Sequence, residues 1–282
     1  MASATALSYD VLVLDGKPRK SELRMPDGGP LMSSPLSVTL IHGERDAVLV
    51  DPPFTYDQIQ EVGDWVERSG KRLAYIYITH GHGDHWFGTA ELVKRFSGAK
   101  VYATPGTIGV MERAVQTRQQ MFDDYFPGQI PESPVLAEPI PAEGICLEGH
   151  PVRPMEVGHT DTDETTVLHV PSIGLVVAGD AVYNGVHQML MESAGGGLDE
   201  WLEALDRIEA LRPTAVVAGH KNRELPDDPA IIGRTRAYLQ DAARLLKTHS
   251  DPAPYYEAML GLYPDHLNRS PLWYSAAALL GR

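Results

Sequence analysis

A short segment, His80-Gly81-His82-Gly83-Asp84-His85, places three imidazoles and one carboxylate within six residues. Imidazole nitrogen and carboxylate oxygen are ligands that suit zinc, iron and manganese. On a helix His80 and His82 would point to different sides, so the spacing favours a loop, in which Gly81 and Gly83 would give the backbone its freedom. The segment therefore predicts a metal-binding loop rather than a histidine-rich polar turn.

Apolar runs that read as strands precede this loop and three further candidate ligands. Leu73 to Thr79 leads directly into His80, and similar runs lead into His159, Asp180 and His220. In α/β folds the functional loops gather at the carboxyl ends of strands, so these side chains are expected to meet. One loop cannot complete two coordination spheres, and these three residues are the candidates for the rest.

The remaining elements follow from apolar periodicity and from glycine and proline stops. Further strands are expected at residues 11–16, 37–43, 47–53, 100–103, 152–157, 166–170, 175–178 and 215–218. Helices are expected at residues 56–69, 89–96, 105–126, 199–211, 231–248, 254–262 and 271–280. Residues 127–141 contain five prolines and predict an extended loop, which together with the helix before it is placed to form a lid.

In this order the motifs resemble the metallo-β-lactamase superfamily, in the His-x-His-x-Asp-His form of glyoxalase II-like thioesterases and lactonases. The resemblance covers Ser37 to His220. It implies an α/β fold, a four-layer αβ/βα sandwich with a helical C-terminal extension. Residues 1–282 would form a single domain, with a core at about 8–226 and the extension at about 227–282. Asp51 matches an acidic residue that supports the metal loop in this family.

The resemblance also implies two divalent metal ions, expected to be Zn²⁺, with iron and manganese as alternatives. The expected ligands are His80, His82 and His159 for the first ion, Asp84, His85 and His220 for the second, and Asp180 as a bridge between both. A bridging water would become a hydroxide nucleophile near neutral pH. The implied activity is hydrolysis of an ester, lactone or thioester, with Asp84 also handling the proton.

Two residues refine this expectation. Asp180 stands where the best-known zinc β-lactamases carry a cysteine, which argues against antibiotic hydrolysis as the main activity and leaves weak β-lactamase activity as an alternative. Tyr183 follows three residues later, an offset at which quorum-quenching lactonases carry a tyrosine that polarises the carbonyl under attack. A packed aromatic ring is an equally good interpretation of Tyr183.

Apolar residues beside the metal motifs suggest a substrate with a hydrophobic acyl part. Trp86 and Phe87 adjoin the metal loop, whereas Asn184 and His187 follow the Asp180 motif, and all four are candidates for the substrate pocket. The plainer interpretation is that the aromatic residues belong to the core, and for His187 a structural role is favoured over a catalytic one.

Composition limits the classes of partner and the compartment. The chain has 24 basic and 38 acidic residues, a net charge of −14, which argues against nucleic-acid and membrane-surface binding. The single cysteine, Cys146, excludes an intramolecular disulfide. With neither a signal peptide nor a transmembrane segment evident, a cytoplasmic protein acting on a small molecule is expected, and a homodimer is left open.

Two rival functions use the same ligands. An iron-dependent persulfide dioxygenase would share the fold and most of the ligand set, and metal analysis with a test for oxygen consumption would separate it from a hydrolase. A non-catalytic effector would bind a ligand without needing all seven metal ligands. Within the hydrolases, glutathione specificity is not supported, because the C-terminal region has only scattered basic residues such as Arg234 and Lys247.

Overall fold

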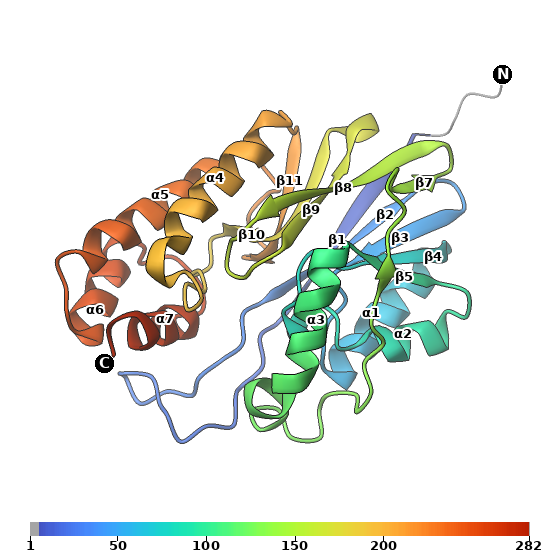
Figure 1. Cartoon of the computed structure of the whole chain (residues 1–282). Helices are drawn as coiled ribbons and strands as arrows, with labels where there is room; N and C mark the ends of the chain where they lie inside the picture. Colours follow the sequence, from blue (N-terminus) through green and yellow to red (C-terminus); the bar gives the residue numbers. More distant parts are fainter. Residues whose placement is uncertain (1–5, 282) are drawn as a thin grey trace.

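The computed structural model describes residues 6–281 and shows two β-sheets packed face to face, with helices on the outer face of each (Figure 1). The first sheet has the strand order β1-β2-β3-β4-β5-β6, and the second has the order β11-β10-β9-β8-β7. Helix, sheet, sheet and helix therefore form the four-layer α/β sandwich that the sequence predicts.

The first sheet comes from the N-terminal half of the chain. Its strands are β1 (Ser8–Leu14), β2 (Leu36–His42), β3 (Asp46–Val50), β4 (Arg72–Tyr77), β5 (Lys100–Ala103) and β6 (Glu138–Pro139). The first three pair antiparallel, whereas β3 to β6 pair parallel. Parallel strands need crossover helices, and these are α1 (Tyr56–Arg68), α2 (Thr89–Arg95) and α3 (Pro105–Arg118).

The second sheet comes from the C-terminal half. Its strands are β7 (Ile145–Leu147), β8 (His150–Gly158), β9 (Thr165–Val170), β10 (Leu175–Asn184) and β11 (Ala215–Lys221). The helices that follow β10 are α4 (Gly197–Ala210), α5 (Ala230–Leu246), α6 (Pro252–Leu262) and α7 (Ser270–Leu280). They lie together on one side of the molecule in Figure 1, where α4 and α5 cover β8 and β10.

Alternating side chains of the central strands fill separate apolar layers. In β3, Leu49 packs with the helices of the first sheet, whereas Val48 and Val50 pack between the two sheets. In β10, Val176 packs beneath the C-terminal helices, whereas Val177 packs between the sheets. Since both faces are buried, these strands read as nearly continuous apolar runs in the sequence.

The predicted elements agree with the structure except at a few ends. The helix predicted over residues 105–126 ends at Arg118 and continues as a π-helical turn, η2 (Gln119–Asp123). Strand β10 runs to Asn184, so Asp180 lies inside a strand rather than after one. The short strands β6 and β7 were not predicted, because two or three residues carry too little periodicity to read. Within the described range, no helix combines the length and apolar character needed to span a membrane.

A long segment between β1 and β2 leaves the first sheet and crosses to the C-terminal helices. In Figure 1 it is the blue trace at the lower left, which runs to the left of α3 toward α7 and returns. Its backbone is held at both ends of this excursion, since Lys20 N donates to Tyr125 O at 2.9 Å and Met32 N donates to Ser270 Oγ at 2.9 Å. The segment therefore joins the two halves of the molecule beside the candidate site.

Candidate metal centre

Histidine and carboxylate side chains gather where β4, β8, β10 and β11 end or bend. Within each of three overlapping groups, the ligand atoms lie within 4.8 Å of one another: His80, His82, Asp161 and Asp180; Asp51, His80 and His85; Asp84, His85 and His220. Six of the seven predicted ligands belong to these groups. The seventh, His159, is not in these groups, and one of them contains Asp161, which was not predicted.

The loop after β4 brings His80, His82 and Asp84 to one place, and its last three residues form a 3-10 turn, η1 (Gly83–His85). Neither glycine of the loop has a positive φ. Instead, a Cβ on Gly81 would lie 2.4 Å from Val110 Cγ1, and one on Gly83 would lie 2.2 Å from the ring of Phe87. The glycines are thus required by close packing and not, as the sequence suggested, by backbone freedom.

A relay of hydrogen bonds orients His80. Asp51 accepts from Thr79 N at 2.8 Å and from Thr79 Oγ1 at 2.6 Å. Because that hydroxyl donates to Asp51, it can accept from His80 Nδ1, which lies 3.0 Å away. His80 Nε2 is then left without a proton and faces the cluster. Asp51 supports the loop in this way, as the family resemblance implied, and also approaches His85 Nδ1 at 3.4 Å.

The same logic fixes the rings of His220 and His159. His220 Nδ1 lies 2.8 Å from the carbonyl oxygen of Pro35, which can only accept, so Nε2 carries the lone pair toward Asp180. His159 Nδ1 lies 2.7 Å from Asp163 Oδ1, and its Nε2 is buried without a hydrogen-bond partner. A histidine whose second nitrogen is held by a carboxylate or carbonyl is the usual form of a metal ligand.

Asp180 is the carboxylate shared by the cluster. Its Oδ1 lies 3.3 Å from His85 Nε2, its Oδ2 lies 3.1 Å from His220 Nε2, and Oδ2 also accepts from Tyr183 Oη at 2.8 Å. The neighbouring strand must come very close here, because a Cβ on Gly219 would lie 2.1 Å from Asp180 Oδ1. A break in the register between β10 and β11 accompanies this approach.

Asp161 is the ligand candidate that sequence reasoning missed. Its Oδ2 lies 2.9 Å from His82 Nδ1 and 3.9 Å from His80 Nε2, and its side chain is fully buried. It follows His159 by two residues in the same loop. Its position as an acidic residue close to a predicted ligand could have identified it from the sequence. Glu192, also unpredicted, lies 3.1 Å from the other nitrogen of His82.

Charged neighbours within the cluster oppose the effect of burial on the pKa values of most of its side chains. Burial disfavours protonation of His82 and His85, but the facing carboxylates of Asp161 and Asp180 outweigh it and raise the pKa of both rings well above the usual value. Burial dominates at His80 and lowers its pKa to about 4. Burial likewise opposes ionisation of Asp180, yet His220 and His85 hold its pKa well below the usual range.

Several atoms of the cluster are buried without hydrogen-bond partners, although such atoms are normally paired. They are His80 Nε2, His85 Nδ1 and Nε2, His159 Nε2, Asp161 Oδ2 and Asp180 Oδ1. All are nitrogen or carboxylate oxygen, which are ligands for a divalent cation, and leaving them unpaired is costly. The residues present therefore fit a metal centre.

A cavity of about 190 Å³ opens onto this cluster. At one end it is lined by His82, Asp84, Asp161, Asp180 and His220, and Tyr183 lies beside them. The remaining wall is largely apolar and comes from η2, the loop after β10, the β1–β2 segment and α7: Arg19, Ser34, Met121, Phe122, Tyr125, Met189, Met191, Glu192, Pro271 and Tyr274. The helix end predicted as a lid does contribute to this wall.

None of the four predicted pocket residues lines the cavity. Trp86 and Phe87 are fully buried in the core under the first sheet, where Trp86 Nε1 donates to Gly81 O at 3.0 Å and so supports the metal loop from behind. Asn184 donates to Pro226 O at 3.0 Å. His187 is fully buried, with its Nδ1 3.1 Å from Tyr238 Oη.

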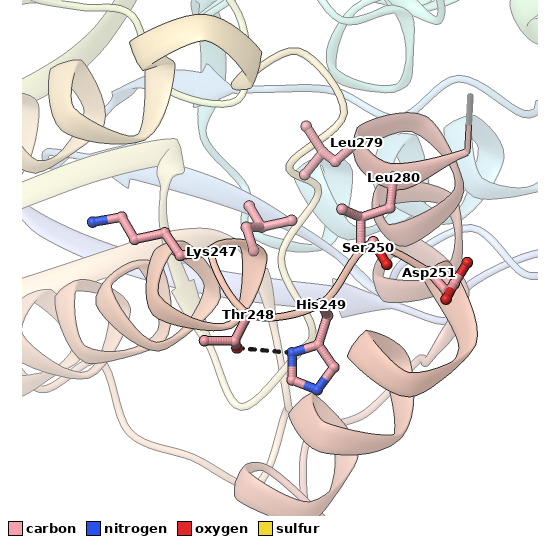
Figure 2. Close-up of a pocket in the computed structure, with 8 residues that line it drawn as sticks. Lys247, Thr248, His249, Ser250, Asp251, Leu279 and Leu280 are labelled. Atoms are coloured by element: carbon pink, nitrogen blue, oxygen red, sulfur yellow. Dashed lines mark hydrogen bonds between the residues drawn. The ribbon is translucent and has the colours of Figure 1, made fainter.

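A larger cavity, of about 590 Å³, lies between the end of α5 and the end of α7 (Figure 2). The close-up shows Lys247, Thr248, His249 and Asp251 around it, with the ring of His249 hydrogen-bonded to Thr248. Among residues 6–281, the groups able to hold a metal ion all lie elsewhere. Chemistry, rather than cavity size, therefore identifies the smaller cavity as the site.

Comparison with known proteins agrees with this geometry. The model of the Metallo-beta-lactamase superfamily matches residues 34–220. A hydroxyacylglutathione hydrolase of Chromohalobacter salexigens is 30% identical over 177 residues, which are 62% of this chain and 56% of that protein. A protein described as a metal-dependent hydrolase, from Staphylothermus marinus, is 24% identical over 198 residues, which are 67% of this chain and 79% of that protein.

Solved structures show the same fold. A metallo-beta-lactamase family protein of Thermus thermophilus has a TM-score of 0.62 at 19% identity, with 96% of this chain and 91% of that one covered. The DIM-1 metallo-beta-lactamase has a TM-score of 0.60 at 16% identity, covering 85% and 99%. The family match, which spans most of the chain and ends at His220, shows that the chain belongs to the metallo-beta-lactamase superfamily.

Proposed function

We propose that the protein hydrolyses a carboxylic ester, lactone or thioester with two divalent metal ions, of which zinc is the expected one. The position of Asp180 supports this proposal most directly. Its two oxygens face His85 and His220 at 3.3 and 3.1 Å, and it also belongs to the group formed by His80, His82 and Asp161. A single carboxylate that faces both groups is suited to bridge two cations.

Two bound ions would supply Lewis acidity and would lower the pKa of a coordinated water toward neutral. The protein side chains divide the remaining tasks. Asp84 lines the cavity, is partly exposed, and lies 3.7 Å from His220 Nε2, so it can both bind an ion and accept a proton at the substrate side. Tyr183 is held by its hydrogen bond to Asp180, so it orients that carboxylate; donation to the substrate oxygen would require it to exchange this partner.

The ligand set of the first ion differs from the one expected. Asp161 lies in its group, and His159 stands beside it with Nε2 unpaired. We propose that Asp161 would hold this ion together with His80 and His82, and that His159 would be a further ligand. Nε2 of His159 lies 2.6 Å from the position of a Gly197 Cβ, so only glycine leaves room for the ring there.

The relatives support the reaction class. One relative, which this chain matches over 56% of that protein's length, is a hydroxyacylglutathione hydrolase. A thioester is therefore among the proposed substrates, and the apolar wall of Met121, Phe122 and Met189 suits an acyl chain. In the described C-terminal helices, Arg236 and Arg244 are already paired with acidic neighbours, which does not favour a glutathione site there.

The test is a panel of aryl esters, lactones and acyl thioesters assayed with zinc-loaded wild type and with His85→Ala, with metal content measured for both. Hydrolysis by the wild type and its loss together with metal in the variant would support the proposal. No hydrolysis of any substrate would refute it. Iron in the purified protein together with oxygen consumption would favour the dioxygenase instead.

A further inference from the structure

Arg19 lines the cavity together with Tyr125 and Tyr274, which are not among the candidate metal ligands. It belongs to the segment that crosses between β1 and β2, and its Cζ lies 5.0 Å from the ring centre of Tyr274, 5.5 Å from that of Tyr125 and 5.8 Å from that of Phe126. Three aromatic rings therefore hold the guanidinium at the cavity surface, where cation–π contacts favour it.

This guanidinium has a buried donor without an acceptor. Arg19 Nε is buried and has no hydrogen-bond partner, while the guanidinium and the hydroxyl of Tyr274, which lines the same cavity, interact with each other. Among the ion pairs of residues 6–281 none involves Arg19, whereas the buried Arg118 is paired with Asp123 and the half-buried Arg95 with Asp64. An unpaired buried donor is costly, so a cation that retains one beside a phenol is suited to an anionic acceptor from outside.

Charge also distinguishes this wall. Of the described residues that line the cavity, Arg19 is the one lysine or arginine, and the other charged side chains are the carboxylates Asp84, Asp161, Asp180 and Glu192 at the metal end. The protein as a whole carries a net charge of −14, which repels anions. An anionic substrate would therefore need a local cation at the end of the cavity that the metal ions do not occupy.

We propose that the substrate carries a carboxylate at the end of its acyl chain remote from the scissile carbonyl, and that Arg19 and Tyr274 bind this carboxylate. This inference rests on the proposed hydrolase function and specifies its substrate class. The planar guanidinium matches a carboxylate in shape, and the phenol adds a further donor. The apolar side chains of Phe122 and Met189 lie along the same cavity and suit the methylene groups between the two ends.

The experiment uses two thioesters that differ only at the far end. One is a glutaric acid monothioester with a free carboxylate, and the other has a carboxamide in place of that carboxylate. Zinc-loaded wild type, Arg19→Met and Arg19→Lys are compared, with Arg68→Met, an exposed arginine on α1, as the charge-matched control. Methionine keeps the apolar stem of Arg19 and removes its charge and donors.

We expect Arg19→Met to lower kcat/KM for the carboxylate by about 10- to 100-fold, mainly through KM, because a hydrogen-bonded ion pair is lost. For the carboxamide, Arg19→Met should change kcat/KM by less than about two-fold. For the carboxylate, Arg19→Lys should have an intermediate kcat/KM, and Arg68→Met should have the kcat/KM of the wild type. If Arg19→Met lowers kcat/KM equally for both substrates, or lowers only the melting temperature, then Arg19 serves to fasten its segment to α7. The inference is then overturned, while the hydrolase function stands.

If neither thioester is hydrolysed, the hydrolase proposal fails and binding decides the inference separately. Glutarate and glutaramate, its monoamide, are titrated calorimetrically into the zinc-loaded wild type and Arg19→Met. Each offers one carboxylate to the metal end, and only glutarate offers a second. Tighter binding of glutarate that Arg19→Met abolishes would support the inference. Equal binding of the two acids by the wild type would overturn it.

Discussion

Among residues 6–281, histidine side chains gather in two places, and one of these has the features of a metal centre. The second, termed the aromatic histidine cluster, consists of the buried His187 and Tyr238 and the half-buried Tyr263 and His266, among the C-terminal helices. The rings of His187 and His266 lie 5.5 Å apart, and His187 Nε2 is buried without a partner, as in the metal centre. Asp241 accepts a hydrogen bond from the hydroxyl of Tyr263 at 2.8 Å and is paired with Arg244, so it makes no hydrogen bond with either histidine.

Carboxylates make the difference between the two. In the metal centre Asp161 and Asp180 overcome burial and raise the pKa of His82 and His85. At His187 no carboxylate opposes burial, and the neighbouring His266 and Arg269 act in the same direction, so the pKa of His187 falls to about 3. Carboxylate ligands help to offset the loss of a dication's hydration, and aromatic rings provide no such charge. Burial of histidines is therefore a weak sign of a metal site, whereas burial of histidines facing carboxylates is a strong one.

The largest expected effect comes from removing the shared carboxylate. Asp180→Ala should lower hydrolysis by more than about 100-fold, which exceeds the effect typical of residues that only support a ligand. It should also reduce metal content, measured by elemental analysis. His187→Phe, which alters the aromatic histidine cluster, is the matched variant and should keep its metal. Equal metal contents in Asp180→Ala and the wild type would show that this carboxylate does not distinguish the metal centre from the aromatic histidine cluster.

Removal of the metal should destabilise the protein through the metal centre and not through the aromatic histidine cluster. A ligand that binds only the folded state and is present at a free concentration of about 1,000 times its Kd stabilises that state by about 4 kcal/mol. Chelation should therefore lower the melting temperature measured by calorimetry, and added Zn²⁺ should restore it in a concentration-dependent manner. His187→Phe should show the same dependence on Zn²⁺ as the wild type. A melting temperature insensitive to chelation would argue against a structural contribution of the ions.

Asp161 provides a sharper test within the metal centre. Asp161→Asn keeps the size of the side chain and removes its charge, so it should lower metal affinity by about 10- to 100-fold in competition with a chromophoric chelator. His159→Asn provides the companion measurement for the ligand that the sequence predicted. An effect at His159 and none at Asp161 would show that the short distance from Asp161 to His82 reflects support of the ring rather than ligation of the ion.

The smallest expected effect is a pH dependence of stability. The unfolded chain protonates His187 near the usual pKa of 6.5, whereas the folded protein resists protonation until about pH 3. Protons therefore favour the unfolded state, and the stability due to His187 is complete above pH 6.5 and is lost as pH falls toward 3, by a few kcal/mol at most. His187→Phe should flatten this part of the curve of unfolding free energy against pH, measured by urea denaturation.

A control separates this effect from the loss of any histidine. His249→Phe removes an imidazole at the surface cavity of Figure 2, where the ring is hydrogen-bonded to Thr248. If His249→Phe flattens the curve as much as His187→Phe does, the burial of His187 is not its cause.

Much of the fold was predictable from the sequence because its signals are local. The runs that became β3, β4, β10 and β11 are apolar on both faces, and proline and glycine mark the helix boundaries. The segment from His80 to His85 was equally legible, because its ligand types and spacing are contained in six neighbouring residues. The family resemblance, later shown by the match over residues 34–220, followed from the same motifs.

The direction of individual side chains depended on tertiary packing. Trp86 and Phe87 adjoin the metal loop in sequence, yet both point into the core, because the loop needs apolar support from behind. Asp161 rather than His159 faces His82, since the conformation of their loop decides which side chain points inward.

By itself, the sequence determined most of the strands and helices and the ligand types in the segment from His80 to His85, since each depends on residues close together in the chain. Only the tertiary structure decided what surrounds the metal ligands. Arg19 and Tyr274 are far apart in sequence, and no periodicity links them, but the segment after β1 and helix α7 place them side by side at the cavity. Contacts between distant segments follow from how the whole chain packs, and so local patterns carry no record of them.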